Sequence, residues 1–270
     1  VPLPGEAREP QEPRLCAACV RDVPRCACCL EPILATWWSF EELLPSATPR
    51  HFCERCVREQ PRCDLCGAPV GGSRGVLPDG QMRCARCAVE MVLADADAQA
   101  LYQTALEVAR RVAGIAPRSV PALTLVGRRR MADLRGEYGA GLITMPDEPR
   151  QPVDASAHHF FGFFVQAHGN AAIFAEMGLP RPLLLGTLAH ELGHAWQAER
   201  APGLRDPLRC EGFAEWVAYR VLGAQGHEAI AARAPRREDV YGRGLRHYLE
   251  IERAHGIPGV LAAARGASGR

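Results

Sequence analysis

The sequence TLAHELGHAWQAER, residues Thr187 to Arg200, carries two histidines four positions apart, with a glutamate directly after the first. Leucines recur at helical spacing at Leu184, Leu188 and Leu192, and they predict a buried helix from about 183 to 199. Residues four apart lie on one face of a helix, so both histidine rings are able to reach one metal ion. The alternative is a pair of histidines that fall one helical turn apart by chance.

His190 and His194 are therefore the first two predicted metal ligands, in the pattern H-E-x-x-H. Glu191 is placed to take a proton from a metal-bound water. Glu211 follows His194 by 17 residues, in the segment RCEGFAEWVAY, and is the predicted third ligand. Glu215, one turn later, is expected to hydrogen-bond the other nitrogen of a ligating histidine and fix its tautomer. A solvated helix face is the alternative, but the aromatic neighbours predict burial, where unpaired carboxylates are costly.

Cysteines are concentrated in the first third of the chain. Eleven of the twelve lie between residues 16 and 87, and ten of them form C-x-x-C pairs. This spacing lets two thiolates of one tight turn bind a tetrahedral zinc ion at about 2.3 Å. Disulfides are the alternative, but we see no secretion signal at the N-terminus, which favours metal.

Two cysteine-rich stretches repeat each other. CAACVRDVPRCACCLEP (16–32) and CERCVREQPRCDLCGAP (53–69) match at an offset of 37 residues, which indicates a duplicated zinc module. The spacers after them, of 23 and 17 residues, are each long enough for a β-hairpin. We expect two structural zinc sites, formed by Cys26, Cys29, Cys53 and Cys56, and by Cys63, Cys66, Cys84 and Cys87. Cys16 and Cys19 are then half of an incomplete module, while Cys28 and His51 are bystanders or substitute ligands.

The rest of the chain predicts further helices and a few strands. Helices are expected at about 209–222 and 242–254, with one or two more after Ala88. Strands are expected for PALTLVG (121–127), GLITM (141–145), FFGFFVQA (160–167) and NAAIFAEMG (170–178). The isolated His158, His159 and His168 are expected to be surface or core residues.

Composition narrows the range of partners. A formal net charge of +1 gives no electrostatic basis for binding nucleic acid or an anionic membrane surface. No apolar run approaches the roughly 20 residues that span a bilayer. We therefore expect a cytoplasmic protein without nucleic-acid or membrane partners. All 32 basic residues are arginine, so no side chain can be ubiquitinated on lysine.

The order of these motifs resembles the plant LIM-domain peptidases that limit organ growth (the "DA-one" type), over roughly Cys53 to Gly226. The strings GLPR, LAHE, HAW and EG carry the resemblance, and H-E-x-x-H followed by E-x-x-x-[DE] is the gluzincin arrangement. The resemblance implies a zinc endopeptidase that acts on selected protein substrates. It carries over His190 and His194 as ligands, Glu191 as base and Glu211 as third ligand.

The chain also departs from that family. Six residues link Cys56 to Cys63, whereas the usual LIM linker has two. The absence of lysine and of ubiquitin-binding motifs means that the plant enzymes' regulation by ubiquitin does not transfer. The simpler zinc module and its duplication suggest a bacterial relative.

The expected fold class is α+β, with a LIM-like zinc module before a mainly helical, gluzincin-type metallopeptidase domain that has a small β-sheet. The expected domains are an N-terminal tail (1–25), the two-zinc module (26–90) and the peptidase domain (91–270). One catalytic and two structural zinc ions are the expected cofactors. The LIM-like module is expected to offer a surface to a protein partner.

The expected mechanism is peptide hydrolysis by metal-activated water. Glu191 accepts a proton from that water and passes it to the leaving amine. The donor to the oxyanion is left open among Tyr219, Tyr241, His247 and Tyr248. The substrate is expected to add as a strand beside NAAIFAEMG.

Two alternatives stay open. The first is a catalytically silent, zinc-dependent interaction adaptor, which the glutamate of H-E-x-x-H disfavours. The second is a protease inhibited by its own N-terminal segment.

Overall fold

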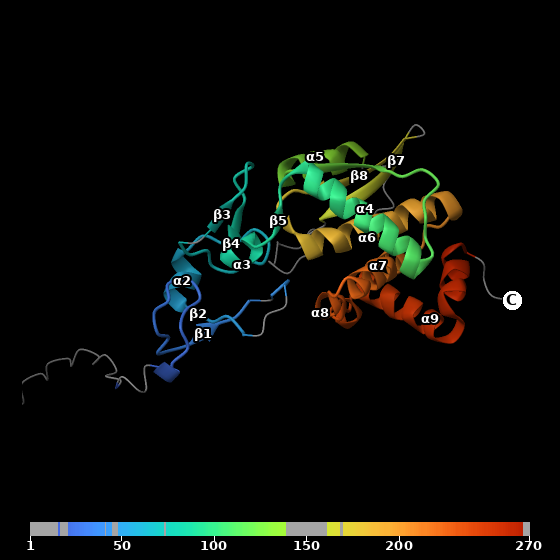
Figure 1. Cartoon of the computed structure of the whole chain (residues 1–270). Helices are drawn as coiled ribbons and strands as arrows, with labels where there is room; N and C mark the ends of the chain where they lie inside the picture. The colour runs from blue at the N-terminus through green and yellow to red at the C-terminus, as the bar shows by residue number, and fades with distance from the viewer. Residues whose placement is uncertain are drawn as a thin grey trace, which may run out of the picture.

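The structure is a computed structural model that describes residues 16, 21–40, 42–44, 48–72, 74–138, 161–167 and 170–266. It is an α+β protein in which two small cysteine-rich modules precede a mainly helical body (Figure 1). The α+β prediction is therefore confirmed. The predicted strand at 141–145, Cys19 and the isolated His158, His159 and His168 lie outside the described residues.

Each cysteine-rich module contains a small antiparallel strand pair and a short helix. In the first module β1 (Trp37–Trp38) pairs with β2 (Phe52–Cys53), which runs into α2 (Glu54–Glu59). In the second, β3 (Arg74–Val76) pairs with β4 (Met82–Cys84), which runs into α3 (Ala85–Ala88). Both spacers thus form the strand pairs that their lengths predict.

Four long helices form the body: α4 (Asp95–Ala113), α6 (Arg181–Arg200), α7 (Pro207–Ala224) and α9 (Val240–Ala264). The short α8 (Glu228–Ala231) and a 3₁₀ turn, η1 (Ala234–Arg236), connect the last two. Asp206 begins α7 by accepting hydrogen bonds from the amides of Leu208 and Arg209. The predicted helices at 183–199, 209–222 and 242–254 are confirmed, and α6 and α7 extend further than the periodicity indicated. α9 is kinked at Gly256 (φ 63°, ψ −171°), close to the predicted end at 254, and a second helical segment follows.

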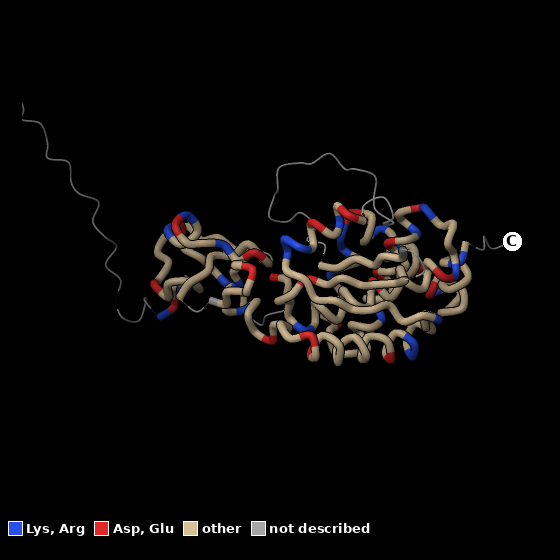
Figure 2. The backbone as a smooth tube through the Cα atoms, turned by 90° about the horizontal axis from the view of Figure 1, so that it is seen from above, with Lys and Arg blue, Asp and Glu red and all other residues tan. Residues whose placement is uncertain are grey.

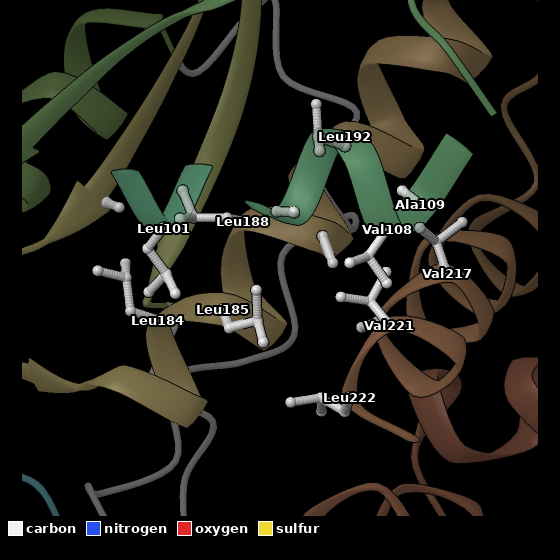
Figure 3. Close-up of a cluster of buried hydrophobic side chains, with 14 of the residues drawn as sticks. Leu101, Val108, Ala109, Leu184, Leu185, Leu188, Leu192, Val217, Val221 and Leu222 are labelled. Carbon is white, nitrogen blue, oxygen red and sulfur yellow. The ribbon is translucent and has the colours of Figure 1, made fainter. Parts of the chain in front are cut away.

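The main core lies where α4, α6 and α7 meet. Leu101 and Val108 of α4 contribute to the same buried cluster as Leu188 of α6 and Val221 of α7 (Figure 3). The leucine stripe of the opening stretch is therefore the face by which α6 joins the body.

A three-stranded sheet lies beside α6. It contains β6 (Ala122–Val126), β8 (Asn170–Glu176) and β7 (Gly162–Ala167), in that order, with β6 parallel and β7 antiparallel to β8. Val126, Phe163 and Val165 pack against α5 (Arg128–Tyr138) on the face away from the main core. The sheet is therefore a layer between α5 and α6.

The position of β8 corrects one expectation. The segment NAAIFAEMG was expected to receive a substrate strand, but it forms β8 and is paired on both sides. Among the described strands β7 pairs with β8 alone, so no described strand covers its other edge. One face of β7 packs against α6, because a Cβ added at Gly162 would lie 2.6 Å from Cγ2 of Thr187 and 3.5 Å from Cγ of Glu191. The other edge of β7 also meets α6, because the backbone amide of Phe164 donates to the carboxylate of Glu191.

A second, two-stranded pairing joins distant parts of the chain. β5 (Met91–Val92), just after the second cysteine module, pairs with β9 (Leu179–Pro180), which is continuous with α6. The helical periodicity after Ala88 did not predict the strand that interrupts it.

The cysteine modules differ in their packing. Cys26, Phe52 and Cys56 belong to a small separate core, whereas Cys63 and Cys84 belong to the main one. The predicted boundary between residues 90 and 91 falls inside this shared core.

Basic and acidic residues are interspersed over both parts of the molecule (Figure 2). None of the described helices is both long enough and apolar enough to cross a bilayer.

Candidate metal centres

The histidine site joins α6 and α7. Nε2 of His190 lies 3.1 Å from Nε2 of His194 and 3.2 Å from Oε2 of Glu211, and His194 Nε2 lies 3.4 Å from the same oxygen. A tetrahedral zinc ion with bonds of about 2.0–2.1 Å places its ligand atoms roughly 3.4 Å apart. The three predicted ligands are thus brought together in a geometry that fits one zinc ion.

Two close helix contacts set this geometry. A Cβ added at Gly193, directly before His194, would lie 2.7 Å from Cα of Ala214. One added at Gly212, directly after Glu211, would lie 2.5 Å from Cα of Gly244 on α9. A side chain at position 193 would force α6 away from α7, and one at position 212 would force α7 away from α9. Gly193 therefore lets the ligands of α6 and α7 lie within reach of one ion, while Gly212 fixes α7 against α9.

Glu215 has the predicted orienting position. Its Oε2 lies 3.1 Å from Nδ1 of His190, whose Nε2 faces the other ligands. A carboxylate on Nδ1 fixes the tautomer that leaves Nε2 for a metal. Nδ1 of His194 is buried and has no comparable partner among the described residues.

Burial and the neighbouring charged groups shift the pKa values of the site residues in opposite directions. Burial disfavours the imidazolium of His190, but hydrogen bonds to Glu211 and Glu215 outweigh burial and raise its pKa to about 10. Burial also disfavours a charged Glu211, yet the adjacent His194 and His190 hold the pKa of Glu211 well below its usual range. The site therefore favours an ionised Glu211 next to nitrogen donors.

Glu191 lies beside these ligands without belonging to the group. It is 5% exposed, and burial raises the pKa of its carboxyl, although the nearby histidines and the backbone amide of Phe164 favour the charged form. A carboxylate with a raised pKa is suited to accept a proton and give it up again.

Tyr241 is the aromatic candidate that lies next to the histidine site. Its ring centroid is 5.9 Å from that of His190, and burial raises its pKa. The guanidinium of Arg237, which the sequence analysis did not identify, lies over the Tyr241 ring, 4.8 Å from its centroid. Helix periodicity gave no signal for Arg237, because it precedes α9.

The other candidates contact different neighbours in the described part of the chain. Tyr219 packs against the main core, and the His247 ring contacts Tyr248 at 5.4 Å. Tyr248 is buried against Phe213, with centroids 5.7 Å apart. No contact of Tyr219 or His247 with the three ligands is found among the described residues.

The eight cysteines form the two predicted groups, Cys26, Cys29, Cys53 and Cys56, and Cys63, Cys66, Cys84 and Cys87. Sγ of Cys29 lies 3.9 Å from Sγ of Cys53, and the equivalent distance from Cys66 to Cys84 is 3.7 Å. Thiolates on a tetrahedral zinc ion lie about 3.8 Å apart, whereas a disulfide bond is about 2.05 Å long. These cysteines are all free thiols, so the geometry fits metal and excludes disulfides.

The duplication extends to the backbone. The amide of Cys26 donates to the carbonyl of Glu31, and 37 residues later Cys63 donates to Ala68. Leu30 and Gly67 share a positive φ, 67° and 71°. The two repeats thus form the same metal-binding turn.

Three further residues with side chains able to bind metal lie at or near these sites. Cys28 is half-buried beside Cys56, and His51 lies against the Trp37 ring with centroids 5.2 Å apart. Cys210 is buried, and burial raises its pKa to about 11, which makes it a packed thiol.

No protein-family model, curated protein or solved structure matches the chain. The resemblance to LIM-domain peptidases therefore stays a prediction that depends on the motifs.

Proposed function

We propose that the chain is a zinc-dependent endopeptidase of the gluzincin type, related to the LIM-domain peptidases. The observation that carries the proposal is Glu191, a buried carboxylate next to the group formed by His190, His194 and Glu211. A site that only stabilises the fold has no use for an acidic group outside the ligand set, and burying one is costly.

Each residue of the site has a defined task in this proposal. His190, His194 and Glu211 would hold the ion, with Glu215 orienting His190. Zinc in a three-ligand site supplies Lewis-acid activation of water and of a peptide carbonyl. Glu191 accepts the proton of the attacking water and donates it to the leaving amine. Tyr241, beside His190, is the donor we assign to the oxyanion.

The edge of β7 that no described strand covers suggests how a peptide binds. The amide of Glu176 donates to the carbonyl of Phe161, so in this antiparallel pair the alternate residues Gly162, Phe164 and Gln166 direct their backbone groups to the other edge. The backbone amide of Phe164 donates there to the carboxylate of Glu191. An extended substrate that pairs with the exposed Gln166 end of this edge would approach the base from the side of the strand. Backbone pairing of this kind favours protein substrates in extended form.

The test compares Glu191→Gln with wild type on a library of peptides from a digested proteome, with cleavage sites read by mass spectrometry. We expect cleavage to fall at least about a hundredfold, because the proton acceptor is lost. Zinc per chain, counted by elemental mass spectrometry, should stay unchanged.

The matched control is Glu250→Gln, which removes an exposed carboxylate of α9. It should cleave like wild type. Equal cleavage by Glu191→Gln and wild type would exclude the proposed mechanism. If His190→Ala/His194→Ala binds as much zinc per chain as wild type, the result would instead favour the catalytically silent adaptor.

A further inference from the structure

The second cysteine site is in direct contact with the segment that leads into α6, the helix that carries His190 and His194. Cys87 is followed within four residues by β5, whose Val92 pairs with Leu179 of β9. The amide of Arg181, the first residue of α6, donates to the carbonyl of Glu90. The start of α6 is thus hydrogen-bonded to the chain that leaves this site.

A buried arginine adds a second connection. Arg83, directly before the ligand Cys84, is fully buried, and its guanidinium lies 3.2 Å from the carboxylate of Glu176 at the end of β8. It also donates to the carbonyl of Gly178 at 3.3 Å. Glu176 receives a further hydrogen bond from Arg128, at 3.1 Å. The turn between β8 and α6 therefore depends on the position of the residue next to Cys84.

The β3–β4 turn of the same module adds a third connection. Leu77 is buried against Gly178, where any side chain would overlap it. Gly178 has a φ of 78°, a conformation that favours glycine. The segment that leads into His190 is therefore held by Leu77 and Arg83 at Gly178, and by Glu90 at Arg181.

The first cysteine site has no hydrogen bond or strand pairing to the segment before α6 in the described part of the chain, although Leu44 of its spacer lines a pocket with Glu90, Pro180 and Pro182. Its ligands Cys26 and Cys56 pack with Phe52 in the small separate core. Three contacts join its spacer to the second site. The guanidinium of Arg50 donates to Sγ of Cys84 at 3.5 Å, and that of Arg86 donates to the carbonyl of Leu44 at 3.0 Å and lies 3.4 Å from the carboxylate of Glu42.

We propose that a metal ion held by Cys63, Cys66, Cys84 and Cys87 fixes the start of α6, and that the histidine site depends on it. Small four-cysteine modules take their fold from the metal. Without the ion, β4 and α3 lose their anchor, and Arg83 and Glu90 lose the positions from which they hold the turn. A metal at the first cysteine site is dispensable for α6. The dependence of the histidine site rests on the metal binding in the proposed function, but the effect on α6 does not.

The experiment measures amide hydrogen exchange by mass spectrometry in the full chain with zinc supplied. It compares Cys63→Ser/Cys66→Ser with its counterpart 37 residues earlier, Cys26→Ser/Cys29→Ser. We expect the amides of residues 181–189 to exchange at least tenfold faster in the first variant and as in wild type in the second. Equal protection of these amides in both variants would overturn the proposal.

Zinc per chain separates this proposal from the function. The Cys63→Ser/Cys66→Ser protein should lose two ions, its own and that of the histidine site, and the counterpart only one. Loosening of α6 in a protein whose histidine site never holds zinc would support the proposal for α6 and contradict the proposed function.

General unfolding of the Cys63→Ser/Cys66→Ser protein would also remove the hydrogen-exchange protection of α9. A second variant therefore tests the same contact without removing a thiol. Arg83→Met keeps all eight thiols and breaks the contact with Glu176 and Gly178. We expect residues 181–189 to exchange faster while zinc at both cysteine sites is retained. Unchanged exchange in Arg83→Met would overturn the proposal.

Discussion

The two cysteine modules share their ligand turn but not their surroundings. In both, the amide of the first cysteine donates to the residue five positions on, and an arginine before that cysteine donates to the carbonyl four positions after it. They differ at the residue before the third cysteine. Phe52 packs in a small core against Phe40, with ring centroids 5.5 Å apart, whereas Arg83 reaches Glu176 in the sheet.

This difference shows that a ligand motif and its packing are separate properties of the sequence. The C-x-x-C spacing determines that the thiols converge in a geometry that could hold an ion. The neighbours of the ligands determine whether the module folds around its own core or becomes part of a larger one. The next three predictions test this division.

The largest effect is expected for Glu176→Ala. It leaves Arg83 fully buried without its carboxylate. An uncompensated buried charge of this kind costs about 3–5 kcal/mol. Urea unfolding should show that much loss in the free energy of unfolding of the body.

Glu42→Ala is the control for Glu176→Ala. Glu42 pairs with Arg50 and Arg86, but these side chains are partly exposed. The loss should be about 1 kcal/mol or less, because water screens such pairs. Equal effects of the two variants would mean that the second module is no more integrated than the first.

An intermediate effect is expected for Phe52→Ala, and it should be local. The ring is 1% exposed, and truncation of a buried phenylalanine costs about 3 kcal/mol or more. Because Phe52 lies in the separate core, the loss should appear in the hydrogen exchange of α2 and not in the unfolding of α6 and α7. Destabilisation of both parts by the same amount would contradict the separation of the cores.

The smallest effect is expected for Asp79→Ala, in the β3–β4 turn. Its carboxylate accepts from the amide of Arg128 at the start of α5, and the loss of such a cap costs about 1 kcal/mol. Burial disfavours the charged form, but hydrogen bonds from Gln81 and Arg128 outweigh it and lower the pKa of Asp79.

Because the pKa of Asp79 is lowered in the folded state, its contribution to the free energy of unfolding depends on pH. A lowered folded-state pKa contributes stability that is present above the unfolded pKa of about 4 and is lost as the pH falls through the folded value. Thermal unfolding of wild type and Asp79→Ala should therefore differ at pH 7 and converge below about pH 4. A difference that stays constant at all pH values would mean that the cap is not ionised.

Much of the candidate site was predictable because its signals are local. His190, His194, Glu211 and Glu215 lie on two consecutive helices, and helical spacing places them on facing sides. The cysteine groups follow from a turn motif and its repeat. Neither prediction needs to know how distant segments meet.

The unpredicted features all depend on distant segments. The pairing of Val92 with Leu179 and the contact of Arg83 with Glu176 join parts that no local pattern connects. The central position of β8 was missed for the same reason, since its strand pattern is similar whether one or both edges are paired.

The separation of Arg83 from Glu176 has a consequence for synthesis of the chain on the ribosome. The small core of the first module is completed by Ala68, 42 residues after Cys26, whereas Arg83 meets its carboxylate 93 residues later. His190 and Glu211 are only 21 residues apart. Loop closure grows costlier with chain length, and domains form in the order in which they emerge. The nascent second module therefore carries an unpaired cation until β8 has been translated, and its docking comes late.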